Sequence, residues 1–157
     1  GDAMNDTFPQ EAYTDEAFFK LEMQHIFSNT WALAGLVEDI VEVGDYITVQ
    51  AGLTNILLIM NKQGQLAAFH NMCRHRVTQL LRAVGKAQKA ITCPYHDWTY
   101  NLNGQLTSVP DQEKEFPDLE KDKICLHKAS VDIWRGMIWV HPKPTAQPIT
   151  KWFESYL

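Results

Sequence analysis

Two short stretches of this 157-residue chain each place a cysteine close to a histidine. The first reads Cys73-x-His75, and after seventeen further residues the second reads Cys93-x-x-His96. A disulfide framework would pair cysteine with cysteine, and a zinc finger usually groups Cys-x-x-Cys apart from His-x-x-x-His. Each stretch here offers one thiolate and one imidazole, so together they provide donors for a metal centre with two unlike ends.

A [2Fe–2S] cluster would use this donor set fully, with the two cysteines on one iron and the two histidines on the other. Two ferric ions and two sulfides sum to a charge of +2, which two thiolates and two neutral imidazoles bring to zero. A neutral centre accepts an electron more readily than one with four thiolates, so its reduction potential lies at about −150 to +300 mV. A structural zinc site is the alternative, and it would need all four residues on one tetrahedral ion.

The apolar pattern of the chain predicts the elements that would position these stretches. A helix is expected over 14–31, where Thr14 suits the N-cap and apolar residues recur at three- and four-residue steps. Short runs bounded by turn residues then predict strands. They lie near 31–37, 45–50, 55–60, 66–71, 89–93, 97–101, 105–109, 131–134 and 137–140.

Turn chemistry connects the later runs. Asn103-Gly104 and Arg135-Gly136 are the expected hairpin turns. The charged segment 111–123 between these hairpins is expected to be a solvated excursion. The pattern as a whole predicts a mainly β fold, a small antiparallel barrel or sandwich with cluster-binding loops, preceded by an N-terminal helix.

Composition and charge exclude several classes of function. Hydrophobic residues make up 45% of the chain, enough for a packed core, and the net charge is −5 without a block of Lys or Arg. Nucleic acid and membrane are therefore not expected as partners. No run approaches the roughly 18 apolar residues of a membrane span, and no signal peptide is recognised. Three cysteines at spacings unsuited to pairing indicate a reducing compartment, so we expect a cytoplasmic protein.

The full pattern Cys-x-His-x17-Cys-x-x-His is the Rieske signature. The surrounding 69-FHNMCRHR-76 and 93-CPYHDWTY-100 resemble the N-terminal Rieske domain of a ring-hydroxylating oxygenase α subunit. The resemblance covers nearly the whole chain. It extends to 13-YTDEAFFKLEMQHIFSNTW-31, 44-GDY-46, 103-NGQL-106 and 139-WVHP-142.

This resemblance implies a function in electron transfer. The [2Fe–2S] cluster would relay electrons from a reductase or ferredoxin to a mononuclear Fe(II) that activates dioxygen, in an enzyme that forms homo-oligomers. That iron needs two histidines and a carboxylate on a further domain, so no catalytic residue is expected here. We expect residues 1–30 to combine an expression remnant with the helix, 31–142 to form the Rieske domain, and 143–157 to be a linker and the start of a catalytic domain.

Other branches of the Rieske proteins fit less well. Respiratory-chain members carry an extra cysteine in each loop, but Val77, Thr78 and Tyr95 occupy the loop positions here. A free-standing Rieske ferredoxin, an electron carrier without an oxygenase domain, is the alternative function. Such ferredoxins usually lack the long N-terminal helix, so the helix favours the oxygenase branch.

Two residues depart from the pattern that the resemblance implies. Val77 and Asp97 stand where the family usually has glycine. Glycine at such positions suggests a positive φ, which Asp tolerates far better than a β-branched Val. We expect Asp97 to leave the fold intact, and its carboxylate to lower the reduction potential of the neighbouring cluster.

Several further residues could be mistaken for site residues. His70 is expected to be structural, His25 to pack in the helix, and His127 and His141 to lie at the surface. Cys125 is expected to be a small buried apolar residue. The remaining candidates flank the cluster ligands. Trp98 and Tyr100 could tune the cluster or simply pack in the core. Arg74 and Arg76 could guide an electron donor or simply be solvated charges.

Overall fold

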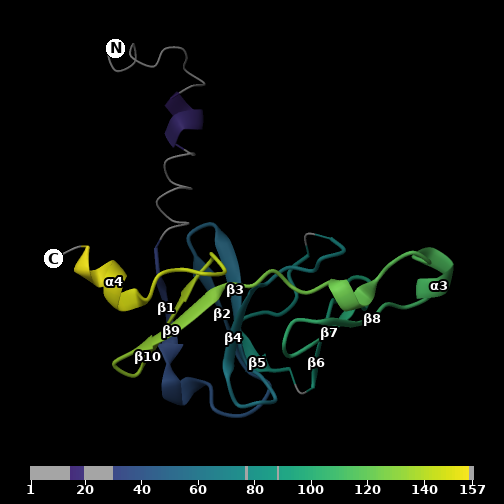
Figure 1. Ribbon diagram of the computed structural model, residues 1–157, viewed down its shortest axis with the longest axis horizontal. Coiled ribbons are helices and arrows are strands. Elements are labelled where there is room, and N and C mark those ends of the chain that lie inside the picture. Colours follow the sequence, from purple (N-terminus) through teal and green to yellow (C-terminus); the bar gives the residue numbers. More distant parts are fainter. Residues whose placement is uncertain (1–14, 20–29, 77, 88, 156–157) are drawn as a thin grey trace.

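The computed structural model describes residues 15–19, 30–76, 78–87 and 89–155 (Figure 1). Residues 15–19 are helical, whereas Thr30 and Trp31 are not. The rest of the helix predicted over 14–31, with His25, lies outside the described residues, as does Val77.

The described residues form three small antiparallel sheets. The first has the order β1-β10-β9, with β1 at Ala32–Leu36, β10 at Met137–His141 and β9 at Ser130–Trp134. The second has the order β4-β3-β2-β5, with strands Leu66–His70, Thr54–Met60, Asp45–Ala51 and Val84–Lys86. The third has the order β6-β7-β8, with strands Ala90–Thr92, Thr99–Asn101 and Leu106–Ser108. The short helices are η1 (Val37–Asp39), α3 (Gln112–Glu115), η2 (Lys121–Lys123) and α4 (Ile149–Glu154).

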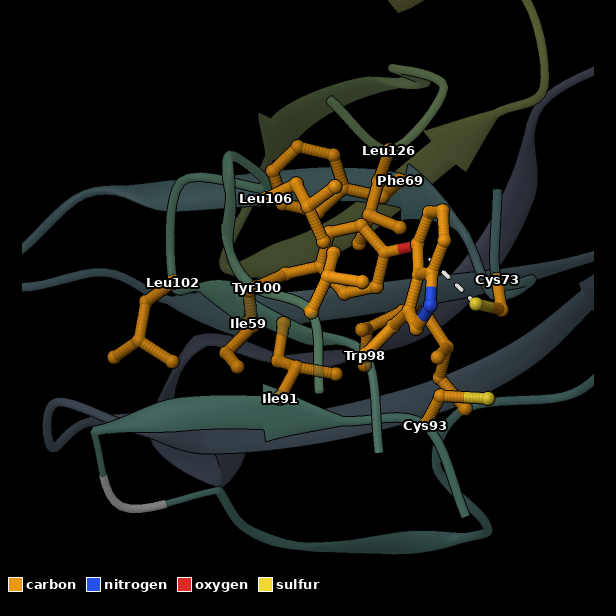
Figure 2. Packing of buried hydrophobic residues seen from close by; sticks show 13 residues of the cluster. Ile59, Phe69, Cys73, Ile91, Cys93, Trp98, Tyr100, Leu102, Leu106 and Leu126 are labelled. Carbon is orange, nitrogen blue, oxygen red and sulfur yellow. Dashed lines mark hydrogen bonds between the residues drawn. The ribbon is translucent and has the colours of Figure 1, made fainter. Parts of the chain in front are cut away.

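Strand β3 divides the hydrophobic core into two clusters. Its residues 56–59 are fully buried, and successive side chains of a strand point to opposite faces. Leu57 and Ile59 pack in the cluster that also contains both predicted cysteine ligands (Figure 2). Ile56 and Leu58 pack on the other side, against β10. One continuous apolar run thus supports the ligand loops and anchors them to the first sheet.

Both predicted hairpin turns are present. Arg135 and Gly136 have φ values of 53° and 76° between β9 and β10, as a two-residue turn with positive φ at both positions requires. Gly104 has a φ of 85° in the turn between β7 and β8. A Cβ at Gly104 would lie 2.6 Å from the Phe69 ring, so close packing also demands glycine there.

Two local predictions need correction. The edge strand β5 was not expected, because its three exposed residues carry no alternating apolar signal. In β5, Gly85 lies opposite Tyr46 of β2, and the pairing needs glycine there because a Cβ would come within 2.9 Å of the Tyr46 hydroxyl. The prediction of a surface position for His141 was wrong. His141 is only 4% exposed, packs edge-on against Trp31 and accepts a hydrogen bond at Nδ1 from the Lys143 amide.

Within the described residues, no helix has the length and apolar character needed to cross a membrane.

Asp45 provides a test of the pairing between β2 and β5. Its Oδ2 accepts the amides of Val41 and Glu42, and its Oδ1 lies 3.3 Å from Lys86 Nζ. The two backbone hydrogen bonds, assisted by Lys86, lower the pKa of this carboxyl below its ordinary value. The charged form is therefore favoured by folding, and its contribution to stability is present above the unfolded-state pKa and lost as pH falls through the folded one.

We expect Asp45→Asn to reduce the free energy of unfolding near neutral pH, by an amount that shrinks towards zero as the solution is acidified below pH 4. Denaturant unfolding of both proteins at several pH values measures this difference. Glu42→Gln is the control, because Glu42 is exposed and contributes only a surface ion pair with Lys86. A difference that stays constant down to the lowest pH would contradict the assignment.

Candidate metal centre

The two predicted Cys–His stretches lie on adjacent loops, and the structure places the two cysteines in one buried cluster and the two histidine rings beside each other. Cys73 and Cys93 are buried, with 4% and 1% of their surface exposed, and both belong to the same hydrophobic cluster. Figure 2 shows both thiols at the same edge of the packed cluster, beside Trp98. The rings of His75 and His96 lie farther out, with centroids 4.9 Å apart and planes inclined at 69°.

The donors therefore form a thiol pair inside and an imidazole pair outside. In the described part of the chain, no three His, Cys, Asp or Glu side chains converge as a single metal ion would require. A cluster with two unlike irons would take the thiol pair on one iron and the imidazole pair on the other.

The second loop turns sharply between β6 and β7. The Cys93 amide donates to the Trp98 carbonyl, and the Asp97 amide donates to the Cys93 carbonyl, at 2.8 and 3.0 Å. The φ of Asp97 is 58°, which confirms that this position needs the left-handed region. The turn directs the amides of Tyr95 and His96 at the Cys93 sulfur. Burial raises the pKa of the Cys93 thiol, and these amides oppose that effect by favouring the thiolate.

The first loop is closed by a residue that no motif or spacing had singled out. Asn71, which is 3% exposed, directly follows β4. Its Nδ2 donates to the Leu81 carbonyl at 2.8 Å, and its Oδ1 accepts the Leu81 amide at 3.1 Å. The same Nδ2 also donates to Asn55 Oδ1 on β3. One side chain thus ties both ends of the loop to each other and to the central strand.

Tyr100 lies beneath the first loop and is fully buried. Its hydroxyl is 3.2 Å from Cys73 Sγ and accepts the Arg74 amide at 2.9 Å (Figure 2). Burial is the main reason that the pKa of Tyr100 is raised, so the phenol keeps its proton. A ligating Cys73 would be a thiolate with no proton to give, so the Tyr100 hydroxyl must donate to the sulfur. Packing and hydrogen bonding, the two roles considered for Tyr100, occur together.

The two imidazoles have different surroundings. His75 is half-buried and stacks on Trp98, with centroids 4.6 Å apart and planes inclined at 10°. Burial, followed by the nearby His96 and Arg76, lowers the pKa of His75 and favours the neutral ring, which is the form that binds a metal. His96 is exposed, and Tyr95 stacks on it at 4.1 Å. The guanidinium of Arg76 lies 5.2 Å from the centre of the Tyr95 ring.

The segment 111–123 is not the simple solvated excursion that its charges suggested. Most of its charged side chains are exposed, as expected, but Phe116 and Leu119 pack against the core cluster. The Phe116 ring lies edge-on to both His75 and Trp98. Two apolar residues at a spacing of three were the signal in the sequence, and the surrounding charges hid it.

The other flanking residues have structural contacts. Arg74 donates from Nη1 to the Cys125 carbonyl at 2.7 Å, so this guanidinium fastens the first loop to a neighbouring segment. Cys125 is half-buried, and its thiol donates to Gln105 Oε1. His70 lies in β4 with its Nε2 2.8 Å from the Pro142 carbonyl, which supports the structural role predicted for it, and His127 is exposed as expected.

The residues present fit a [2Fe–2S] cluster. Buried thiols with amide donors suit the inner iron, and an adjacent pair of imidazoles, one half-buried and one exposed, suits the outer iron. The Tyr100 hydroxyl beside the Cys73 sulfur adds a hydrogen-bonding partner outside the ligand set, of the kind that tunes such centres.

Comparison with known proteins identifies a family that this chain matches. The family described as the Rieske [2Fe–2S] domain matches residues 30–134. The α subunit of biphenyl 2,3-dioxygenase from Rhodococcus jostii is 37% identical over 129 residues, which are 82% of this chain and 28% of that protein. The glycine betaine monooxygenase oxygenase subunit from Chromohalobacter salexigens is 45% identical over 114 residues, 72% of this chain and 25% of that protein.

Solved structures show the same likeness. A naphthalene 1,2-dioxygenase superposes with a TM-score of 0.78 at 30% identity, over 88% of this chain and 32% of the other. A quaternary ammonium Rieske monooxygenase gives the same TM-score and identity over 92% of this chain and 40% of the other. The chain spans less than a third of the length of the curated relatives described above.

Proposed function

The chain belongs to the Rieske [2Fe–2S] domain family, and we propose that it transfers single electrons to the mononuclear iron of an oxygenase. Cys73 and Cys93 would hold the inner iron, and His75 and His96 the outer one. When bound, the cluster supplies a site that takes up and releases one electron. The observation that carries the proposal is a pair of buried thiols together with a pair of adjacent imidazoles, one half-buried and one exposed.

The residues of the chain support this role by their placement. Trp98 and Tyr100 are 5% and 0% exposed, so they exclude water from the thiol side of the site. The amides of Tyr95 and His96 and the Tyr100 hydroxyl are donors that stabilise negative charge on the two sulfurs. The exposed His96 ring gives a partner protein a short path to the site.

The partners follow from the same proposal. The electron donor would be a reductase or ferredoxin in the cytoplasm, and the acceptor an iron held by two histidines and a carboxylate in an oligomeric enzyme. Aromatic-ring hydroxylation is the reaction proposed for the whole enzyme, supported by the biphenyl, chlorobenzene and benzene dioxygenase relatives. Oxidation of a quaternary amine is the second candidate, favoured by the 45% identity to a glycine betaine monooxygenase subunit.

The test is metal and redox analysis of the chain on its own. Purified residues 1–157 should contain iron and acid-labile sulfide in a ratio of about one, be brown, and accept about one electron per two irons. They should form no hydroxylated product with aromatic or quaternary ammonium compounds, even with added ferrous iron, because the chemistry needs a second iron with open positions. Zinc in place of iron would refute the cluster. Product formation by this chain would refute the proposal that oxygen is activated at a second iron outside it.

A further inference from the structure

The two imidazoles are held to very different degrees. His75 has aromatic rings on three sides, because Trp98 covers one face while His96 and Phe116 meet it edge-on. The rings of His75 and Phe116 have centroids 5.5 Å apart and planes inclined at 81°. His96 is exposed, and the exposed side chain of Tyr95 stacks on it. Only one of the two rings is therefore enclosed by the fold.

Phe116 reaches His75 from outside the two ligand loops. It ends α3, where its amide donates to the Gln112 carbonyl at 2.7 Å and its carbonyl accepts the Leu119 amide. The segment is fixed at two points. Gln112 Nε2 donates to the Leu119 carbonyl at 2.9 Å, and Gln105 Nε2 donates to the Lys121 carbonyl at 2.7 Å.

The same ring also contacts Trp98. The Phe116 and Trp98 rings have centroids 5.6 Å apart and planes inclined at 90°. Phe116 therefore meets both members of the His75–Trp98 stack edge-on, and neither ring can turn or slide without losing a favourable contact. Aromatic pairs prefer this edge-to-face geometry because the positive ring edge meets the negative ring face.

We propose that Phe116 is a positioning residue that fixes the ring of His75 against Trp98 and shields it from water. The inference rests on the proposed function, in which His75 is an iron ligand. Orientation matters because the plane of an imidazole determines how its nitrogen orbital meets the metal. Shielding matters because reduction adds negative charge, which water stabilises, so a drier ligand keeps the reduction potential lower.

The test compares Phe116→Ala and Phe116→Leu with the unchanged protein, all carrying the cluster. We expect a higher reduction potential, and a changed nitrogen coupling for one histidine and not the other in pulsed EPR of the reduced state. We also expect the chromophore to be lost about tenfold faster at moderate denaturant, from the removal of two edge-to-face contacts. Phe116→Leu keeps an apolar side chain but removes the aromatic ring, so it tests the proposal if the alanine variant does not fold. Phe116→Tyr keeps the ring and should restore all three properties.

Phe153→Ala is the matched control. Phe153 is a partly buried phenylalanine on α4 that packs on Trp134 and Trp139, at the end of the molecule opposite α3 (Figure 1). It should lower stability without moving the potential or the EPR couplings. If the Phe116 variants also left the reduction potential and the EPR couplings unchanged, Phe116 would only contribute to packing. This inference would then be refuted, and the proposed function would still stand. Absence of a cluster from the unchanged protein would refute the proposed function instead.

Discussion

Replacing either predicted thiolate with serine should yield a colourless protein. In Cys73→Ser or Cys93→Ser the inner iron loses one of its two protein ligands, in a site that is nearly closed to water. Loss of an outer hydrogen-bonding partner typically costs about 10–100-fold in metal affinity, so loss of a direct ligand should cost more than about 100-fold. Iron and sulfide analysis, with the visible spectrum, measures the effect.

The chain contains its own control for this experiment. It has three cysteines, and the third, Cys125, bonds to Gln105 away from the other two. Cys125→Ser should keep the colour and the iron content. If Cys125→Ser bleached the protein while Cys93→Ser did not, the ligand assignment would be wrong.

Removing the Tyr100 hydroxyl should lower the reduction potential while leaving the cluster in place. With Cys73 as a thiolate ligand, the hydroxyl would donate to Cys73 Sγ. Reduction would increase the negative charge on that sulfur, so the hydrogen bond would be stronger in the reduced state. If Tyr100→Phe removes a bond that is about tenfold more favourable in that state, the potential falls by roughly 59 mV for one electron. Spectroelectrochemical titration at fixed pH measures the shift.

Tyr46→Phe is the control for Tyr100→Phe. Tyr46 also donates its hydroxyl in the same domain, but to the Arg82 carbonyl at 3.1 Å. Its loss should affect stability and leave the potential unchanged. Equal shifts in reduction potential for the two variants would indicate a general loosening of the domain. They would contradict a specific effect of the hydrogen bond between Tyr100 and the Cys73 sulfur.

The sequence predicted the strands that carry a local signal. Nine predicted runs overlap β1–β4 and β6–β10, and both hairpin turns were recognised, because alternation and glycine chemistry act between near neighbours. Strand β5 was missed because its pairing depends on Gly85 meeting Tyr46, residues far apart in the chain. His141 was misplaced for the same reason, since its burial arises from packing against Trp31.

The candidate site was predicted to a similar degree. The four donors followed from residue type and spacing. The structure places the two cysteines in one cluster and the two histidine rings side by side, and their role as ligands stays a prediction. The supporting residues did not follow from spacing. Asn71 is an ordinary strand-end asparagine until its contacts to Leu81 and Asn55 are seen, and Phe116 is embedded among charges. Such residues act through long-range contacts, which a single sequence does not reveal.

The closure of the first loop by Asn71 bears on how the centre is assembled. Bringing the ends of a flexible loop together has an entropic cost, and a cofactor that had to impose this closure would bind correspondingly more weakly. Here Asn71 joins the two ends through bonds made entirely by the polypeptide. The cost is therefore met when the domain folds. Part of the order of the first loop that iron and sulfide would otherwise have to impose is thus supplied by Asn71.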